Sequence, residues 1–360
     1  MFFSPGLLFD LNAQPRRYVS MKVGVLTGGG DCAGINAVVR GVVRRAEDKE
    51  AAVVGIRRGW AGLLESDYVP LDYDRVADLV SVGGTFLLTS RTNPFKKEGG
   101  PQLVMKNVKE AGFDALIAIG GEDTLGVAHR LADLGLKAVG VPKTIDNDLS
   151  ETDVTFGFDT AVNVAVDSID RIRTTGMSHE RIMVVEVMGR DAGWIATHAG
   201  IAGGAHIILV PEEEFDIGDV CETVIARKKA GRNFTLIVAA EGARVRLKHG
   251  QVTSAQDLDE FGHPKLGGIG HLLAGEIERV THLECRDVVL GHTLRGGSPL
   301  AYDRVLSTRL GVAAMDLVAK GRFDRMVALK GNAIVDVGMG DAIKPKALDR
   351  ELLSIGRLFH

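Results

Sequence analysis

Cysteine and aromatic residues are scarce in this sequence, and each scarcity is informative. The three cysteines, Cys32, Cys221 and Cys285, are far apart and form no CxxC pair, which argues against a disulfide framework and predicts free thiols in a reducing cytoplasm. Aromatic residues make up 5% of the chain, against 45 glycines, which indicates lean side-chain packing and many tight turns. That balance favours an α/β architecture, in which glycine ends strands.

Long apolar runs and long basic runs are also missing. No apolar run reaches the ~20 residues that span a bilayer, and the net charge of -4 comes without a long basic run. We therefore expect no membrane or nucleic-acid partner, and a cytoplasmic location. The apolar stretches within residues 1–20 follow no basic region and are interrupted by Pro5 and Asp10, so they form no signal peptide. We expect residues 1–20 to be a dispensable extension or the product of a misplaced start codon.

Two apolar runs in the first half of the chain each end in a polar turn. Residues 114–119 read as a buried parallel strand that leads into the turn 120–124, and residues 137–141 lead into the turn 142–148. Parallel strands end at the same edge of a sheet, so the two turns can face one another across a crevice. The sequence thereby predicts one site that holds a set of charged residues, namely Glu122, Asp123, Lys143, Asp146 and Asp148.

This mixture of residues favours phosphoryl transfer. That chemistry needs glycine turns whose amides approach phosphate, a carboxylate for magnesium, a cation for developing charge and a carboxylate to accept a proton. Taken singly, each piece also has a bland interpretation, because a Gly-Gly pair is usually only a turn and an Asp-Asn-Asp triplet usually a self-capping loop. Both loops together, about one βαβ unit apart, are much harder to obtain by accident.

The start of the chain adds a third glycine turn. Residues 21–27 predict a strand, residues 28–34 a glycine-rich turn and residues 35–46 a helix, which is a phosphate-binding arrangement. A nicotinamide dinucleotide fold is the competing interpretation. Against it, the glycine spacing is not a clean G-x-G-x-x-G, and the ribose-binding acid expected ~20 residues further on does not end a strand.

Four later positions carry polar side chains that are candidates for binding. Arg91 lies in the polar loop 90–94, Met188-Gly189-Arg190 follows a strand at 182–187, and Glu241 follows a strand at 233–240. His292 and Arg295 lie on a glycine-rich turn after a strand at 286–291. These residues can also be interpreted as purely structural: Arg91 as a solvated loop residue, Glu241 as a turn cap, and His292 with Arg295 as part of a structural turn.

These motifs together resemble the 6-phosphofructokinases. The carriers are GGEDT at 120–124, PKTIDND at 142–148 and the GGD-x-x-G-x-N turn at 29–36, and the first two resemble the branch that uses inorganic pyrophosphate in place of ATP. Six motifs occur in the family's order over residues 21–343. The resemblance implies two Rossmann-like α/β domains with the active site in the cleft between them: a phosphoryl-donor domain at 21–157 plus about 295–343, and a fructose 6-phosphate domain at 158–294.

The resemblance also implies roles for individual residues. Asp146 accepts the proton of the C1 hydroxyl of fructose 6-phosphate as that hydroxyl attacks phosphorus, with Asp148 orienting the site or helping to hold magnesium. The catalytic set is Asp146, Asp148, Lys143, Asp123 and Arg190; the pyrophosphate set is Gly30, Arg91, Asp123 and Lys143; Glu122 is the residue at the metal, Mg2+. The fructose 6-phosphate set is Thr144, Ile145, Asp146, Arg181, Met188, Gly189, Arg190, Glu241, Arg286, His292 and Arg295. In this family pattern, Arg181 and Arg286 reach in from a neighbouring subunit, which implies a homodimer or homotetramer.

The choice of phosphoryl donor depends mainly on Asp123. ATP-using relatives have a small glycine after the acid, and two like charges about 4 Å apart at an effective dielectric of about 20 repel by about 4 kcal/mol. Lys143 discriminates less well, because some ATP-using relatives keep it. Two alternatives stay open: an ATP-dependent enzyme of the same fold, and a non-catalytic sugar-phosphate-binding regulatory subunit. The second alternative draws on three departures from the family pattern, Ala33, Met177 and Asp191.

Overall fold

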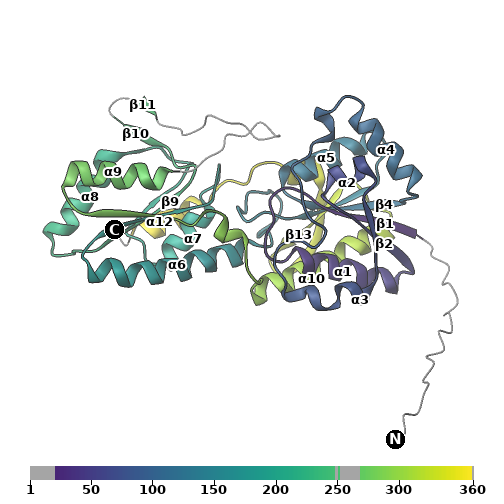
Figure 1. The fold of residues 1–360 in the computed structure, drawn as a ribbon, viewed down its shortest axis with the longest axis horizontal. Helices are drawn as coiled ribbons and strands as arrows, with labels where there is room; N and C mark the ends of the chain where they lie inside the picture. The colour runs from purple at the N-terminus through teal and green to yellow at the C-terminus, as the bar shows by residue number, and fades with distance from the viewer. Residues whose placement is uncertain (1–20, 248–249, 252–267, 359–360) are drawn as a thin grey trace, which may run out of the picture.

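The computed structural model describes residues 21–247, 250–251 and 268–358, and these form two α/β halves (Figure 1). The expectation for residues 1–20 lies outside this range. The first half contains a seven-stranded sheet in the order β14-β13-β5-β4-β1-β2-β3, parallel except for the two edge strands β14 and β3. Its strands are β1 (Met21–Thr27), β2 (Ala51–Ile56), β3 (Tyr68–Leu71), β4 (Ala115–Gly120), β5 (Ala138–Pro142), β13 (Arg325–Lys330) and β14 (Ala333–Gly338).

Helices cover both faces of this sheet, which explains why β4 and β5 are apolar along their whole length. Alternate β4 side chains enter the two cores, Ile117 on the side of α1 and α10, and Leu116 on the side of α2, α4 and α5. The helices are α1 (Ile35–Asp48), α2 (Trp60–Glu65), α3 (Tyr73–Val76), α4 (Gly100–Glu110), α5 (Glu122–Ala132), α10 (Ala301–Ala319) and α11 (Met339–Ala342), with short 3-10 helices at Ala77–Ser81 and Pro94–Lys96.

The second half contains a four-stranded parallel sheet in the order β12-β6-β9-β7. Its strands are β6 (Ile182–Val187), β7 (Ile207–Leu209), β9 (Thr235–Ala240) and β12 (Cys285–Val289), and a small separate sheet contains β8 (Phe215–Asp216), β10 (Val245–Leu247) and β11 (Gly250–Gln251). One face carries α6 (Phe158–Ser178), α7 (Trp194–Ala202) and α12 (Arg350–Arg357), and the other carries α8 (Ile217–Lys229) and α9 (Ile269–Thr281) (Figure 1). The predicted α/β fold class is confirmed.

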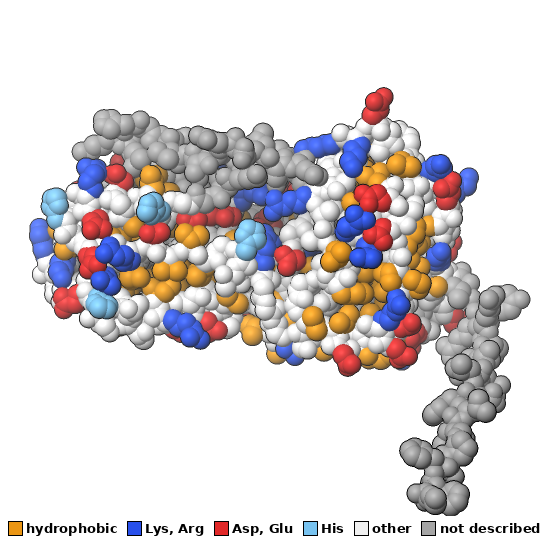
Figure 2. All heavy atoms as spheres, viewed as in Figure 1, with side chains coloured by type: hydrophobic (Ala, Val, Ile, Leu, Met, Phe, Trp, Pro, Cys, Tyr) orange, Lys and Arg blue, Asp and Glu red, His pale blue; other side chains and the backbone are white. Residues whose placement is uncertain are grey.

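The cysteines, the surface charges and the lengths of the apolar helices can be compared with what the composition predicted. All three cysteines are buried free thiols. On the face seen in Figure 2, acidic and basic side chains are interspersed, and Lys and Arg gather where the two halves meet. Among the described helices, none combines the length and apolar character that crossing a membrane requires.

A buried carboxylate joins the two halves. Asp303, on α10 of the first half, is 0% exposed and accepts hydrogen bonds from the backbone N–H groups of Gly157 (2.8 Å) and Thr160 (2.9 Å). It also accepts one from the Thr160 hydroxyl. These donors are the N-cap residue and the first turn of α6, so Asp303 caps a helix of the second half from outside that helix. The chain later returns to the second half, where α12 packs against α7, a contact that the sequence did not indicate.

Helices α1 and α10 approach so closely that each needs a glycine at the contact. A Cβ atom added at Gly311 of α10 would lie 2.2 Å from the carbonyl oxygen of Val38, and one added at Gly41 of α1 would lie 2.7 Å from that of Thr308. Backbone atoms cannot move aside as a flexible side chain can. The two helices therefore pack backbone to backbone.

We expect Gly311→Ala to lower the free energy of unfolding by about 1–3 kcal/mol, since the added methyl group overpacks this contact. Gly275→Ala is the matched control, because Gly275 also lies within a helix but nothing is within 4 Å of its added Cβ. There the better helix propensity of alanine should raise stability by up to about 1 kcal/mol. Equal effects of the two substitutions in chemical denaturation would contradict the close contact.

Candidate active site

The two turns that follow β1 and β4 converge at the carboxyl edge of the first sheet, around the side chain of Thr124. An added Cβ would lie 2.6 Å from Thr124 Oγ1 at Gly28 and 2.2 Å from Thr124 Cβ at Gly120, so glycine lets the ends of β1 and β4 close around this residue. The indole N–H of Trp60 donates to the Thr124 carbonyl (3.3 Å). The amino end of α5 therefore opens into the crevice that these turns border, with Glu122 and Asp123 in its first turn.

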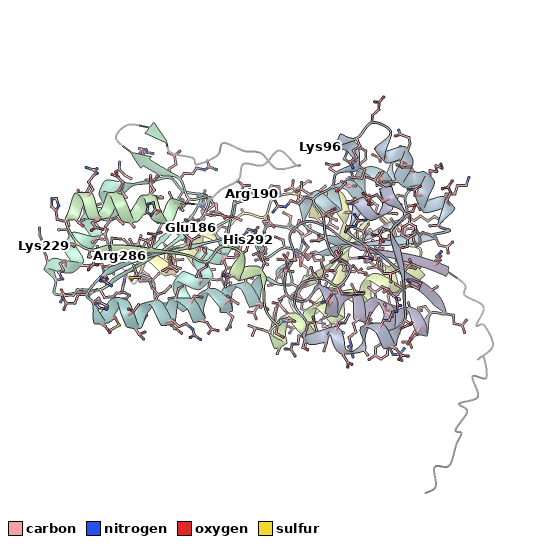
Figure 3. The ribbon with its side chains drawn as sticks, viewed as in Figure 1. Lys96, Glu186, Arg190, Lys229, Arg286 and His292 are labelled. Atoms are coloured by element: carbon pink, nitrogen blue, oxygen red, sulfur yellow. The ribbon has the colours of Figure 1, made fainter. Side chains whose placement is uncertain are left out.

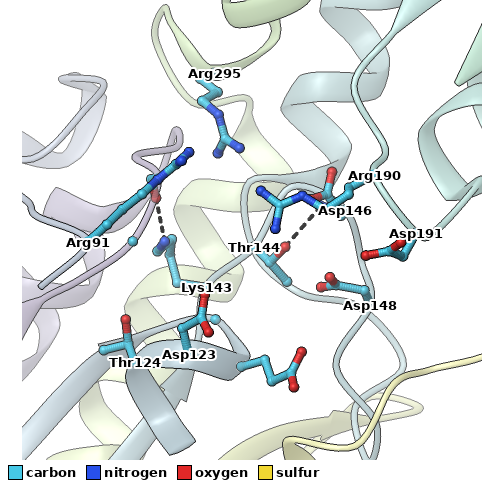
Figure 4. A pocket seen from close by; sticks show the side chains of 14 residues that line it. Arg91, Asp123, Thr124, Lys143, Thr144, Asp146, Asp148, Arg190, Asp191 and Arg295 are labelled. Carbon is cyan, nitrogen blue, oxygen red and sulfur yellow. Dashed lines mark hydrogen bonds between the residues drawn. The ribbon is translucent and has the colours of Figure 1, made fainter. Parts of the chain in front are cut away.

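A pocket lies in this crevice and takes side chains from both halves of the molecule (Figure 4). Arg190 and Asp191 come from the second half, and Arg295 follows the last strand of the second sheet on the 3-10 helix Gly291–Arg295. The full lining is Gly29, Gly30, Arg91, Gly121, Glu122, Asp123, Thr124, Lys143, Thr144, Asp146, Asp148, Arg190, Asp191 and Arg295. The structure thus brings together every charged residue that the sequence placed in the crevice.

The cationic side of the pocket is built on the first glycine turn. Lys143 is 3% exposed, its ammonium group donates to the Gly30 carbonyl, and burial lowers the pKa of this lysine to about 8. The Arg295 guanidinium packs against Gly30, where an added Cβ would lie 2.5 Å from Nη1, and donates to the Asp31 carbonyl (3.1 Å). Arg295, expected at the sugar phosphate, thus lies against the turn that was expected to bind the donor.

The Arg91 loop is attached to the same turn. The N–H of Gly29 donates to the Ser90 carbonyl (3.0 Å), and the Thr89 hydroxyl donates to the Gly29 carbonyl (2.6 Å). Arg91 follows directly and lines the pocket. Its place beside the glycine turn explains why an exposed loop arginine can take part in the site.

Asp146 and Asp148 lie on the turn after β5. Burial, together with a smaller contribution from the neighbouring Asp148 carboxylate, raises the pKa of the Asp146 carboxyl to about 7; burial also raises the pKa of Asp148. The Thr144 hydroxyl accepts a hydrogen bond from the Asp146 N–H (3.1 Å) and fixes the turn (Figure 4). Asp146 Oδ1 is buried and has no hydrogen-bond partner among the described residues. This oxygen can accept a proton from a hydroxyl group bound in the pocket.

The opposite side of the pocket is acidic. Burial raises the pKa of the Glu122 carboxyl, and three nearby carboxylates raise it further, those of Asp123, Asp148 and Asp191. The Asp191 carboxylate faces Asp148 across the crevice (Figure 4). Within the described part of the chain, no three His, Cys, Asp or Glu side chains form a group that could hold a metal ion by themselves. Magnesium usually takes one or two carboxylates together with phosphate oxygens and water, so this acidic side fits a metal ion bound to phosphate.

Two loops of the second half pack on one another beside the pocket. The Gly242 N–H donates to the Gly189 carbonyl (3.2 Å), and a Cβ added at Gly242 would lie 1.7 Å from the Arg190 carbonyl oxygen. Glu241 precedes this contact, and burial raises the pKa of its carboxyl. The structure thereby brings Met188, Gly189 and Arg190 next to Glu241, as the resemblance implied.

The remaining expected residues differ in where they lie. Ile145 is buried in the main core, and Arg190 and His292 lie near the junction of the halves, whereas Arg286 lies further out on the second half (Figure 3). Arg181 and Arg286 stand at the amino ends of β6 and β12, and both pair with Glu284, at 2.8 and 2.6 Å. The pocket adjoins the carboxyl ends of these strands, and neither arginine lines it.

Sequence reasoning assigned no role to four residues of the pocket lining, Gly29, Gly121, Thr124 and Asp191. The first three lie inside motifs that it quoted, so their position in those motifs was an available signal. Asp191 was noted as a departure from the family pattern and was not placed in the pocket, because a sequence does not show to which side a loop carboxylate turns.

Comparison with known proteins identifies the family. The phosphofructokinase family model matches residues 22–318. The chain belongs to the phosphofructokinase family. A pyrophosphate-fructose 6-phosphate 1-phosphotransferase of Amycolatopsis methanolica is 56% identical over 89% of this chain and 94% of the relative, and an ATP-dependent 6-phosphofructokinase of Streptomyces coelicolor is 49% identical over 90% and 95%.

Solved phosphofructokinase structures resemble this one. A pyrophosphate-dependent phosphofructokinase from Nitrosospira multiformis superposes with a TM-score of 0.79 at 21% identity, over 92% of this chain and 86% of that chain. At this identity the likeness shows the fold alone. The two α/β halves are therefore those of the phosphofructokinase fold.

The raised pKa of Asp146 predicts that Asp146→Asn stabilises this phosphofructokinase above neutral pH. The folded state holds a proton that the unfolded state loses near 3.8, so wild-type stability falls as the pH rises from there through about 7. Asparagine does not ionise, so the variant does not lose stability in this way as the pH rises. We expect the variant to gain about 1–3 kcal/mol at pH 8 and much less at pH 5.

Chemical denaturation at both pH values measures this gain, with Asp170→Asn, at an exposed aspartate of α6, as the control. A gain that does not depend on pH, or an equal gain in the control, would contradict the buried carboxyl.

Proposed function

We propose that this protein transfers a phosphoryl group, with magnesium, from pyrophosphate to the C1 hydroxyl of fructose 6-phosphate. The products are fructose 1,6-bisphosphate and phosphate, and the reaction is reversible. The observation that carries the proposal is the position of Asp123 in the pocket lining, on the first turn of α5, together with Lys143. Four relatives at 50–56% identity carry the name of this pyrophosphate-dependent activity, which supports it.

Asp146 is the proposed general base. Its Oδ1 has no donor within the described chain, so it can take the proton of the C1 hydroxyl while the hydroxyl oxygen forms its bond to phosphorus. The bond to the leaving phosphate breaks as the new bond forms. Lys143, Arg91 and Arg190 bind the phosphate oxygens and stabilise the negative charge that is distributed over them in the transition state.

Magnesium would be held on the acidic side of the pocket, by Glu122 and Asp148 directly or through water. When bound, the metal neutralises charge on the pyrophosphate oxygens. Burial raises the pKa of Glu122 most, and the carboxylates of Asp123, Asp148 and Asp191 add to that rise, so a divalent cation would stabilise the ionised forms of these groups.

The pyrophosphate preference follows from the charge of Asp123. A helix amino terminus normally attracts phosphate, because its free N–H groups and dipole favour negative charge. In α5 that place already carries Glu122 and Asp123. A nucleotide α-phosphate about 4 Å from Asp123 would be repelled by about 4 kcal/mol at an effective dielectric of about 20, or roughly a thousandfold in affinity.

An ATP-dependent phosphofructokinase is the second candidate, and relatives at 48–49% identity carry that name. A non-catalytic regulatory subunit is disfavoured, because Asp146, Asp148 and Arg190 all line one pocket.

We assign the sugar phosphate to the second half and to the turn after β5. Residues 158–294 would form the fructose 6-phosphate domain, and residues 21–157 with about 295–343 the donor domain. Arg190, Glu241 and His292 would contact fructose 6-phosphate beside Thr144 and Asp146. The partner subunit's Arg181 and the partner subunit's Arg286 would complete the 6-phosphate site in a homodimer or homotetramer, since each stands away from the pocket of its own chain.

Donor choice is tested by fructose 1,6-bisphosphate formation with magnesium, fructose 6-phosphate and either pyrophosphate or ATP. The wild type should use pyrophosphate alone, and Asp123→Gly should gain ATP binding by one to three orders of magnitude. Asp123→Asn, which keeps the size and removes the charge, separates repulsion from steric overlap. Turnover of the wild type with ATP alone would overturn the assignment of the donor.

Subunit crossing is tested by complementation. Asp146→Asn and Arg286→Ala should each abolish activity, but subunits mixed under refolding conditions should regain it. A hybrid dimer pairs an intact Asp146 with an intact arginine in one of its two sites, so random mixing should restore about a quarter of wild-type activity. If Arg286 instead acts within its own subunit, the mixture stays inactive.

A further inference from the structure

The strongest feature that the proposed reaction does not use is a short segment near the C-terminus, residues 344–346, here called the C-terminal strap. It lies along the loop that carries Asp146 and Asp148. The Lys346 N–H donates to the Asp148 carbonyl (2.8 Å), and the Ser150 N–H donates to the Lys344 carbonyl (3.1 Å). Leu149 and Pro345 form an antiparallel bridge. The strap therefore extends the loop by backbone pairing.

The Lys346 side chain reaches the residue between the two aspartates. Its ammonium group donates to Asn147 Oδ1 (3.2 Å) and to the Asp153 carbonyl (2.6 Å), and it lies 4.8 Å from the centre of the Trp194 ring. Asn147 is 2% exposed and has a φ of 52°, a left-handed conformation that side chains other than glycine seldom adopt. Its Oδ1 also accepts the Thr155 N–H (3.1 Å). Lys346 thus helps to hold Asn147 in this left-handed conformation, which asparagine adopts more readily than most residues.

The same segment is anchored to the second half of the molecule. Trp194 begins α7, directly after the loop that carries Arg190. Beyond the strap, α12 packs against α7, with Leu353 2% exposed and Arg357 paired with Glu213. One stretch of chain therefore contacts both the loop of the proposed base and the helix that follows the proposed phosphate-binding arginine.

We propose that Lys346 is a positioning residue, whose ammonium group fixes Asn147 and thereby aims the Asp146 carboxylate at the bound sugar hydroxyl. Lys346 does not line the pocket, so it acts through the loop and not on a substrate. The inference rests on the phosphoryl transfer proposed above, but it is independent of the choice of donor. Displacing a reacting group by about 1 Å can cost about a hundredfold in rate, so a single cation behind the loop can govern turnover.

Lys346→Met tests this role, because methionine keeps much of the aliphatic stem and removes the charge and the donors. We expect kcat to fall at least about tenfold, with the KM for fructose 6-phosphate changed less than about threefold, and Lys346→Arg to recover most of the loss. Lys344→Met is the matched control: its side chain is exposed and pairs only with Asp341 in the described structure (2.7 Å), so kcat should stay at the wild-type value.

A second measurement reports on the loop without any turnover. Amide hydrogen exchange of a peptide spanning 144–155 should be faster in Lys346→Met than in the wild type and unchanged in Lys344→Met. Faster exchange in Lys346→Met, together with a wild-type protein that does not catalyse the reaction, would support the effect of Lys346 on the loop and overturn the proposed function. Unchanged exchange and a wild-type kcat in Lys346→Met would overturn the positioning role of Lys346 and leave the proposed function intact. If methionine prevents folding, Lys346→Gln, which keeps a donor, takes its place in both measurements.

Discussion

The structure depends on how closely the ends of neighbouring strands approach at one edge of the first sheet. Thr124 fills the space that Gly28 and Gly120 leave, and a side chain on either glycine would collide with it. Because β1 and β4 end so near to one another, the next strand end, after β5, can place the Lys143 ammonium on the Gly30 carbonyl. The donor turn and the loop of the proposed base are thereby held in one geometry.

The close approach of the strand ends also brings opposite charges to different sides of one pocket. Lys143 and Arg295 border the glycine turn, whereas Asp148 and Asp191 lie on the other side, with Asp146 and Arg190 in between (Figure 4). Burial disfavours both kinds of charge, which is why the pKa of Lys143 falls to about 8 and that of Asp146 rises to about 7. Substrate phosphates and a divalent cation would each neutralise one side, and so would lower the electrostatic energy of the charged groups that line the pocket.

Sequence reasoning recovered the parts of the site that follow from strand ends. The runs that became β4 and β5 are buried on both faces and end at the same edge, so their turns had to converge. It could not place Arg295 against Gly30, because that contact joins residues 265 positions apart through a side-chain conformation. Nor could it find α12 or the strap, since the few apolar residues of a helix of about two turns do not show which surface it covers. The resemblance, not the periodicity, supplied the role of each arginine.

The connections between the halves set how accurately the pocket can be formed. The turn after β5 leads into α6, whose first turn is capped by Asp303 from the other half, and the strap returns along that same turn before α12 docks on α7. Each crossing therefore borders either the loop of the proposed base or the helix that leaves it. A hinge placed elsewhere would let Arg190 drift relative to Asp146. Crossings at this loop instead keep the pivot of any motion between the halves next to the pocket, so such motion changes the distance from Arg190 to Asp146 least.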